Sequence, residues 1–443
     1  MFQPVKGTRD YLPDEMRRRN WVLDRIRRVF ECYGFEPLGT PALESWEMLK
    51  IKSGEDIIDQ IYYFKDKSER ELGLRFEWTA SLCRVVASHR ELPMPLKRYA
   101  IGPVWRYEHP SEKRLREFWQ ADADIVGVGE AIADAEVLAV AVDGLKQIGL
   151  KDFKIRVNDR RILEALLNIA DMPLGRSLEI FRAVDKIQKI GVEGVREELK
   201  RLGSSEASIN RLLELIKRRG RPDEVLVDLE RLVAGSPVGL IGLNFLKEIY
   251  KYSKLFGIDE YMQIDLSLAR GLDYYTGPVF EIYAGGFEDY GSIAGGGRYD
   301  DLIKLFGGDQ TPATGVSLGI ERILLLMEEM GMLRNLEFGS RVYVAPSSPR
   351  MRPKAIEVAQ LLRKEGFETD MDLMNRSLTK QLEHADRKGF SWVVIVGERE
   401  MAEGRVTLRC MRTGEQRSVE LVELPGHLRP HSSSSLNFNS AMV

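Results

Sequence analysis

The sequence contains few of the residues that build disulfide frameworks or structural metal sites. Its 443 residues include only three cysteines, Cys32, Cys83 and Cys410, which lie far apart and form no C-x-x-C pair. This usage is typical of a reducing compartment and argues against a structural zinc site. The five histidines are scattered and form no H-x-x-x-H pair. Disulfide-stabilised and zinc-structured classes of protein are therefore disfavoured.

The sequence also lacks a long apolar segment and a strong charge of either sign. No apolar run is long enough to cross a membrane, and the stretch "MFQPVKGTRDYLPDEM" has no apolar core of a signal peptide. We therefore expect a cytoplasmic protein that does not enter a membrane. The formal net charge is -3, so a nucleic-acid partner must be bound by a local basic surface.

The length and composition indicate a globular protein of two or three domains. A single hydrophobic core rarely grows past about 250–300 residues, and 44% hydrophobic with 30% charged residues is ordinary for a globular chain. Changes in sequence texture predict a main domain at 1–173 that resumes at 257–335, a helical insertion at 174–256, a small α/β domain at 338–425 and a disordered tail at 426–443.

Hydrophobic periodicity predicts most of the elements. The segment 12–35 indicates an amphipathic helix that buries Val22, Ile26, Val29 and Tyr33. Strand-like runs follow up to about residue 127, and polar turns between them predict antiparallel hairpins that pair "QIYYFK" with "LGLRFEWTA" and "KRYAIGPVWRYE" with "REFWQADADIVG". After residue 340, alternating β and α patterns predict a largely parallel sheet.

The stretch "LARGLDYYTGPVFEIY" combines a strand pattern with an unusual approach to it. "PVFEIY" is typical of a strand, but Arg270, Asp273, Tyr274 and Tyr275 crowd between glycines before it begins. One interpretation is a turn in which Arg270 pairs with Asp273. The other is a cation and two phenols directed at a ligand.

Polar residues share faces of the neighbouring predicted strands. Because strand side chains alternate, Phe118, Gln120, Asp122 and Asp124 point one way in "REFWQADADIVG". The same period puts Arg106 with Glu108, and Glu77 with Thr79. Carboxylates suit a ligand with amino or imidazole N–H donors, and arginine suits a carboxylate or a phosphate. The alternative is a solvent-facing sheet surface.

Three short motifs leave alternatives open. "AGGGRYDD" fits either a glycine-rich approach to a nucleotide or a tight turn. "KRRGR" at 217–221 could contact a phosphate backbone, although a solvated helix end is more common. "GVSLG" matches the G-x-S-x-G nucleophile elbow with Ser317 as nucleophile, but the parallel sheet and the following histidine of such hydrolases are not evident.

Four segments, in their order along the chain, resemble the class II aminoacyl-tRNA synthetases, and specifically the histidyl-tRNA synthetase family. They are "GPVWRYE…REFWQADADIVG", "LARGLDYYTG", "AGGGRYDDL" and "GVSLGIERILLL". "VKGTRDYLPDE" fits the same family. The resemblance implies an α+β fold, with an antiparallel sheet flanked by helices, a helical insertion and a C-terminal α/β anticodon-binding domain. It also implies ATP-dependent activation of histidine and its transfer to tRNA(His), with Mg²⁺ accompanying ATP and no separate metal site. A paralogue with this fold, a regulatory subunit of ATP phosphoribosyltransferase, typically lacks the C-terminal domain and the "RGLDYY" arginine, both of which this sequence has.

The resemblance assigns roles residue by residue. It implies that Arg270 and Arg106 are catalytic, because fixed cations stabilise charge that builds on the α-phosphate. The implied histidine-binding residues are Glu77, Thr79, Arg106, Gln120, Asp124, Arg270, Tyr274 and Tyr275. The implied ATP-binding residues are Arg106, Glu108, Arg114, Phe118 and Arg322. Asp124 stands where bacterial relatives have glutamate, so its shorter side chain reaches an imidazole either directly or through water.

The resemblance also implies partners. These are L-histidine, tRNA(His) and a second copy of the chain, contacted through the N-terminal helix and "YGFEPLGTPALE". The predicted C-terminal domain carries basic residues suited to phosphates, among them Arg350, Arg352, Arg376 and Lys380.

Overall fold

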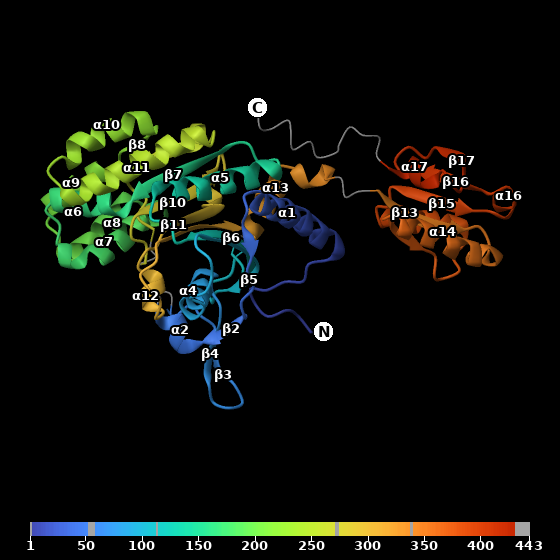
Figure 1. Cartoon of the computed structure of the whole chain (residues 1–443), viewed down its shortest axis with the longest axis horizontal. Coiled ribbons are helices and arrows are strands. Elements are labelled where there is room, and N and C mark those ends of the chain that lie inside the picture. Colours follow the sequence, from blue (N-terminus) through green and yellow to red (C-terminus); the bar gives the residue numbers. More distant parts are fainter. Residues whose placement is uncertain (1, 52–57, 112–113, 271–273, 337–339, 430–443) are drawn as a thin grey trace. The chain divides into compact units, whose positions relative to one another are not determined.

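The computed structural model describes residues 2–51, 58–111, 114–270, 274–336 and 340–429. The chain divides into two compact units, residues 1–335 and 336–443. Figure 1 shows the first unit as a large sheet covered by helices and the second as a smaller sheet with its own helices.

The large sheet has nine strands in the order β1-β5-β6-β12-β11-β10-β7-β9-β8. Its central neighbours are antiparallel, whereas β1 with β5 and β7 with β9 are parallel. The predicted antiparallel sheet of an α+β fold is therefore confirmed. The bounds are β1 Glu36–Pro37, β5 Leu96–Trp105, β6 Glu117–Val126, β7 Phe153–Asp159, β8 Arg219–Gly220, β9 Met262–Asp265, β10 Pro278–Ala284, β11 Ala294–Arg298 and β12 Ala313–Gly319.

Helix α1 (Pro13–Cys32) begins where the sequence predicts. Pro13 occupies its first turn, and the Glu15 side chain accepts a hydrogen bond from the Leu12 backbone N–H at 3.0 Å. The predicted stripe of Val22, Ile26 and Val29 is fully buried. Tyr33 lies just beyond the helix and is half-buried, with its hydroxyl donating to Asp143 at 2.6 Å.

Helices α5 and α13 complete the packing around the sheet. Helix α5 is alanine- and valine-rich and is buried along most of its length, so it forms the centre of the core. Besides α1, the α-helices described in this part are α2 Trp46–Ile51, α4 Thr79–Ser88, α5 Ala131–Gln147, α6 Arg160–Ile169, α12 Leu302–Leu305 and α13 Ile320–Glu329.

Both predicted hairpins form, but their strands β4 and β5 end earlier than the sequence predicted. Strand β3 (Tyr63–Lys65) pairs antiparallel with β4 (Glu71–Leu74), and β2 (Leu43–Ser45) joins them; β5 pairs antiparallel with β6. The run "LGLRFEWTA" was wrongly predicted to be strand throughout. Its end enters α4, because Leu82, Cys83 and Val86 recur at helical spacing and pack into one buried cluster.

The insertion is helical, as its periodicity indicates, with one exception. The segment "KRRGR" starts at the C-cap of α9, Lys217, but it continues into β8, which pairs antiparallel with β9. Arg219 donates to Gln263 at 2.7 Å, so this basic run joins the insertion to the large sheet. The helices of the insertion, which gather beside β8 in Figure 1, are α7 Ser177–Asp185, α8 Ile187–Arg201, α9 Glu206–Ile216, α10 Pro222–Val233 and α11 Pro237–Leu255.

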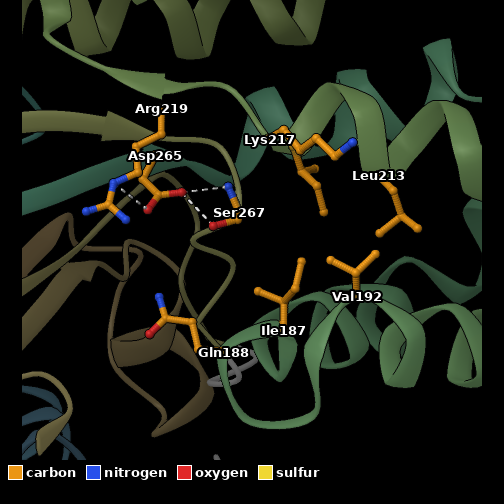
Figure 2. A pocket seen from close by; sticks show the side chains of 9 residues that line it. Ile187, Gln188, Val192, Leu213, Lys217, Arg219, Asp265 and Ser267 are labelled. Carbon is orange, nitrogen blue, oxygen red and sulfur yellow. Dashed lines mark hydrogen bonds and ion pairs between the residues drawn. The ribbon is translucent and has the colours of Figure 1, made fainter. Parts of the chain in front are cut away.

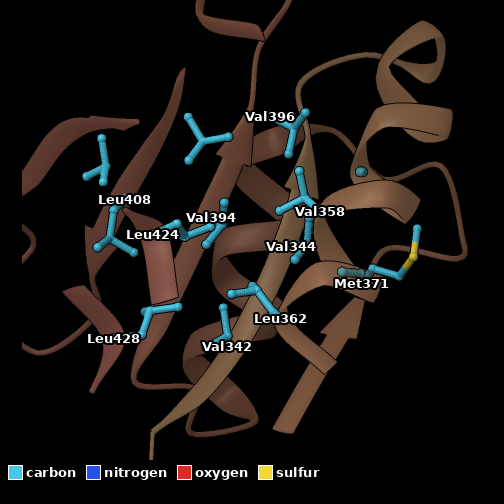
Figure 3. Packing of buried hydrophobic residues seen from close by; sticks show 14 of the residues in the cluster. Val342, Val344, Val358, Leu362, Met371, Val394, Val396, Leu408, Leu424 and Leu428 are labelled. Atoms are coloured by element: carbon cyan, nitrogen blue, oxygen red, sulfur yellow. The ribbon is translucent and has the colours of Figure 1, made fainter. Parts of the chain in front are cut away.

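The second unit contains a five-stranded sheet in the order β14-β13-β15-β16-β17. Strands β14, β13 and β15 are parallel, but β16 and β17 are antiparallel additions, so the expectation of a largely parallel sheet is only half right. Figure 3 shows its core of Val342, Val344 and Val394 packed against Val358 and Leu362. The bounds are β13 Arg341–Pro346, α14 Arg352–Lys364, β14 Glu368–Met371, α15 Leu378–Arg387, β15 Trp392–Val396, α16 Glu398–Ala402, β16 Arg405–Cys410, β17 Gln416–Glu420 and α17 Leu424–Leu428.

The end of the second unit lies further along the chain than we expected. Helix α17 passes residue 426, where the predicted tail starts, and its Leu428 is buried in the core. Residues 430–443 of the predicted tail lie outside the described part of the chain. In the described ranges, no helix combines the length and the apolar character needed to span a bilayer.

A buried ion pair ties the sheet to α5. Arg298, the last residue of β11, donates from Nε to Asp134 Oδ2 at 3.1 Å and from Nη1 to the Val128 carbonyl at 2.9 Å. Both charged side chains are almost fully buried. The arginine of "AGGGRYDD" is therefore an internal anchor for β11.

We expect the Arg298→Met variant to be strongly destabilised. It leaves the buried Asp134 carboxylate without its cation, and breaking a buried pair in this way costs about 3–5 kcal/mol. The midpoint of urea unfolding, followed by circular dichroism, measures the loss. Arg405→Met is the matched control, since the Arg405–Glu420 pair is exposed and should matter little. Equal midpoints for the two variants would contradict the anchoring role.

Candidate active site

A polar cavity lies over β6, β11 and β12, at the middle of the large sheet. We define it by its lining side chains, and all the residues predicted to bind histidine are among them: Glu77, Thr79, Arg106, Gln120, Asp124, Arg270, Tyr274 and Tyr275. The sequence prediction did not include Asp122, Tyr299, Ser317 and the glycines 295, 296 and 315, which also line it. The cavity thus gathers segments separated by more than two hundred positions of the chain.

Strand β6 supplies one wall through the alternation predicted from its sequence. Gln120, Asp122 and Asp124 all line the polar cavity. The backbone N–H of Trp119, on the same strand, donates to the Glu321 side chain at 2.6 Å. The polar face is therefore a site wall and not a solvent-facing surface, since all three side chains are buried.

Several of the other polar residues reach the cavity from the chain just beyond a strand end. Glu77 and Thr79 lie where the chain passes from β4 into α4, and Arg106 and Glu108 follow the last residue of β5. Our expectation that each pair shares a strand face was therefore wrong. Arg106 is held by its Nε, which donates to the Phe76 carbonyl at 3.1 Å.

Arg270 enters the cavity from a backbone in the left-handed region, with φ of 46°. Its Nη1 donates to the Phe280 carbonyl at 3.2 Å, and its guanidinium lies 5.6 Å from the centre of the Tyr275 ring. Burial lowers the pKa of Arg270, but Tyr275 and Glu281 outweigh it and raise the pKa above its ordinary value. Arg270 is therefore a permanent cation. The alternative pairing with Asp273 lies outside the described residues.

Glycines make the space that Arg270 and the neighbouring carboxylate occupy. A Cβ at position 295 would collide with Arg270 Nη1, one at 296 with the Gly315 carbonyl oxygen, and one at 315 with Asp124 Oδ1. The "AGGG" run is a strand of the sheet, so the tight-turn interpretation of it is wrong, whereas a close approach of its glycines to a nucleotide stays a prediction. Its glycines let side chains from other segments lie directly on the sheet.

Asp124 is held by two groups of the protein. Arg98 Nη2 lies 2.7 Å from its Oδ2, and the Tyr299 hydroxyl donates to its Oδ1. Arg98 was not predicted, although it stands directly opposite Asp124 on β5. It is 1% exposed, so a full positive charge lies beneath the cavity wall.

Asp122 lies in the same wall with a different environment. Its side chain is 4% exposed, and among the described residues its Oδ1 has no hydrogen-bond partner. Burial raises the pKa of Asp122 to about 7; Arg98 opposes this increase and Asp124 adds to it. Ser317 also lowers this pKa, yet its Oγ makes no hydrogen bond of acceptable geometry within the described part of the chain.

Three tyrosines form the aromatic side of the cavity. The ring centres of Tyr274 and Tyr275 are 4.5 Å apart, and those of Tyr274 and Tyr299 are 6.1 Å apart. Burial raises the pKa of each phenol. All three are therefore neutral near pH 7 and present both ring faces and hydroxyl groups.

The predicted ATP-binding residues other than Arg106 do not line the polar cavity. Phe118 lies beside Arg106, and Glu108, Arg114 and Arg322 lie near one another. The Arg106 guanidinium is 5.2 Å from the Phe118 ring centre, and Arg114 Nη1 lies 3.1 Å from Glu108 Oε2. Arg322 donates from Nη1 to the Ser292 carbonyl. Burial and the charge of Arg114 lower its pKa, which indicates that these two cations are close.

The hydrolase interpretation of "GVSLG" is wrong. Ser317 stands inside β12, three positions before α13 begins at Ile320, and not on a sharp strand-to-helix turn. No histidine is among the described residues that line the polar cavity. Ser317 therefore has no general base of the kind that such a nucleophile requires.

A second cavity, of about 250 Å³, lies between the insertion and the edge of the large sheet. Figure 2 shows Ile187, Val192 and Leu213 on one side of it and Arg219, Asp265 and Ser267 on the other. Its charged groups already have partners, because Arg219 lies 3.6 Å from Asp265 and Lys217 lies 3.0 Å from Glu214. Of these two cavities, the smaller polar one gathers the chemistry-bearing groups.

Comparison with known proteins gives one consistent result. A family model of histidyl-tRNA synthetase matches residues 7–323, and an anticodon-binding domain model matches residues 341–430. The curated histidine–tRNA ligase of Pyrococcus furiosus is 40% identical over 428 residues, covering 96% of this chain and 98% of that protein. The ligase of Aeropyrum pernix is 43% identical and covers 95% and 96%. A crystal structure of histidyl-tRNA synthetase from a Nostoc species has a TM-score of 0.85 at 30% identity, covering 97% of this chain and 99% of its own.

The pKa of Asp122 predicts how stability depends on pH. The folded chain keeps this proton up to about pH 7, whereas the ordinary value is 3.8. Between pH 3.8 and about 7 the folded state therefore binds more protons than the unfolded state. The contribution of Asp122 to the free energy of unfolding falls as the pH rises through this range. Asp122→Asn removes the effect, so its melting temperature relative to the parent chain should rise from about pH 4 to 7 and then level off. Melting curves of both chains in a pH series measure this, and a constant difference would contradict it.

Proposed function

Because the chain belongs to the histidyl-tRNA synthetase family and so activates histidine and charges tRNA, we propose that the polar cavity is where both steps occur. L-Histidine and ATP would react there to give histidyl-adenylate, and the histidyl group would pass to the 3′ end of tRNA(His). The observation that carries the proposal is the convergence of two arginines, two carboxylates and two tyrosines, all predicted from the sequence, on one buried cavity.

The proposed catalytic residues are Arg270 and Arg106. In the first step a histidine carboxylate oxygen attacks the α-phosphorus of ATP, and pyrophosphate leaves. Negative charge spreads over the phosphoryl oxygens, and preorganised cations stabilise it most where water is excluded. Both guanidiniums are oriented by backbone carbonyls, those of Phe280 and Phe76, which supports this role because little reorganisation is needed.

The remaining cavity residues would bind the amino acid. Glu77 and Thr79 suit the α-amino group, because a carboxylate and a hydroxyl accept hydrogen bonds from an ammonium. Gln120 and Asp124 belong to the wall that would receive the imidazole. Tyr274 and Tyr275 would lie beside the ring, and their neutral state is supported by the raised pKa of each phenol.

The residues around Arg106 would bind ATP. Phe118 would stack on one face of the adenine with Arg322 on the other, and Glu108 would accept from its amino group. Arg114 would contact the γ-phosphate. Mg²⁺ would accompany the phosphates as a counter-ion, and phosphate oxygens would supply most of its ligands, because the described residues contain no group of three or more His, Cys, Asp or Glu side chains arranged for a metal.

We infer the remaining partners from the second unit and the N-terminal segments. The match to an anticodon-binding domain supports recognition of tRNA by residues 341–430. It also argues against the regulatory paralogue, which typically lacks this domain. A homodimer would use the first motif, and the small sheet near it exposes Leu43, Tyr63 and Phe64. Free cysteines, one of them exposed, suit the cytoplasm.

ATP–pyrophosphate exchange over a panel of amino acids tests the function. We expect exchange with histidine only. Arg270→His should slow it by roughly 10²–10³-fold, the typical effect of removing one transition-state donor, while the melting curve and tRNA binding stay close to those of the parent chain.

Arg219→His is a matched control, because Arg219 lies against the second cavity and should leave exchange nearly unchanged. Exchange with a different amino acid would refute the specificity. Nearly full activity of Arg270→His would restore the interpretation of this segment as a structural turn.

A chain shortened after residue 338 separates the two steps. It retains every residue of the polar cavity but loses the anticodon-binding unit. We therefore expect aminoacylation of tRNA(His) to fall far more than histidine-dependent exchange, as measured in parallel on one preparation. Equal losses in the two assays would show that the second unit is needed for adenylate formation itself.

A further inference from the structure

Asp124, predicted from the sequence to contact the imidazole, has little capacity left to do so. Its Oδ1 accepts from the Tyr299 hydroxyl, and its Oδ2 is 2.7 Å from Arg98 Nη2. Its position is fixed from the other side as well, because Gly315, opposite it on β12, lacks the Cβ that would collide with Oδ1. Both carboxylate oxygens therefore serve the protein.

Asp122 is in the opposite situation. It lines the same polar cavity two residues earlier on β6, on the same face as Gln120 and Asp124. Its Oδ1 is fully shielded from solvent and has no hydrogen-bond partner in the described part of the chain. Ser317, directly opposite on β12, is close enough to lower the pKa of Asp122, but its Oγ makes no hydrogen bond of acceptable geometry in the described part of the chain. A buried acceptor without a donor costs free energy, and a ligand N–H placed there removes the cost.

We propose that Asp122 is the residue that accepts the hydrogen bond from the imidazole N–H of bound histidine, and that Asp124, held by Arg98 and Tyr299, positions the wall on which Asp122 stands. This inference rests on the proposed function of the polar cavity. It makes Asp122 a specificity-determining residue and Arg98 and Asp124 positioning residues.

The charges around Asp122 fit this division of roles. Glu77 and Asp124 disfavour a second negative charge, and Arg98 beneath the wall offsets them. At pH 8, above its pKa of about 7, Asp122 is mainly ionised. A carboxylate accepts more strongly than a neutral oxygen. An analogue of histidine whose ring has the same shape but no N–H would leave the Asp122 acceptor buried and unpaired. A site built to accept such a hydrogen bond discriminates strongly against a substrate that lacks the donor.

A matched pair of substrates tests the proposal. β-(Thiazol-4-yl)alanine keeps a five-membered ring and one ring nitrogen but has no ring N–H. In ATP–pyrophosphate exchange at pH 8, the parent chain should prefer histidine over this analogue in kcat/KM by roughly 10–100-fold, the effect expected for a hydrogen bond to a charged group. In Asp122→Leu, which removes the acceptor at similar size, the preference should collapse towards unity, mainly through a higher KM for histidine, with the KM for ATP unchanged.

Arg219→His is the matched control, because Arg219 lies against the second cavity, and it should keep the preference for histidine over the analogue. Asp124→Asn should lower the melting temperature, because it weakens the partner of a buried arginine, and should reduce the preference less than the Asp122 variant does. If Asp122→Leu fails to fold, Asp122→Ala replaces it in the same comparison. Retention of the parent preference by the Asp122 variant, or a larger loss of it in Asp124→Asn than in the Asp122 variant, overturns the proposal. Absence of histidine-dependent exchange in the parent chain would instead refute the function on which the proposal rests.

Discussion

The arrangement of the polar cavity depends on one ion pair buried inside the sheet, between Arg98 and Asp124. An unpaired charge in this position would be prohibitively costly, so each residue requires the other. The two stand opposite each other on β5 and β6, and their pairing therefore holds only in this strand register. A slip of β6 by one residue would turn Asp124 to the other face of the sheet, away from Arg98 on β5. The ion pair thus specifies the register that also presents Gln120 and Asp122 to the cavity.

The strands on the other side of β6 are adapted to the same constraint. Strands β11 and β12 carry glycine at 295, 296 and 315, where Arg270 and Asp124 lie against the backbone. Glycine weakens a strand because it packs no side chain. That loss is offset where Arg298 fastens the end of β11 to Asp134 of helix α5. Rigidity beside the cavity is therefore supplied by an anchor at the strand end, which leaves the middle of the strand open for ligand-facing groups.

The sequence predicted the parts of the site that depend on local pattern. Alternation in β6 identified the face that bears Gln120 and Asp124, and the strand leading into α13 was recognised from its apolar residues. Arg98 was not predicted because its partner is determined by cross-strand register, which no single strand reveals. The junction at Glu77 and Thr79 was misread because a short strand runs directly into a helix, and the aromatic residues there suit both. Strands β16 and β17, which contain many charged residues, were not recognised either, because their pattern is weak.

Under the proposed function, the polarity of the cavity would determine how a bound amino acid is oriented. Carboxylates and neutral phenols occupy one part, formed by Glu77, the β6 wall and the tyrosines, while Arg106 leads towards the cations Arg114 and Arg322. A zwitterion lowers its electrostatic energy by turning its ammonium towards the carboxylates and its own carboxylate towards the arginines. Triphosphate oxygens are attracted to the same cations. In the proposed reaction, this charge distribution would bring the attacking carboxylate and the α-phosphate to one place before any bond forms, and such proximity is itself a large part of the catalysis of a two-substrate reaction.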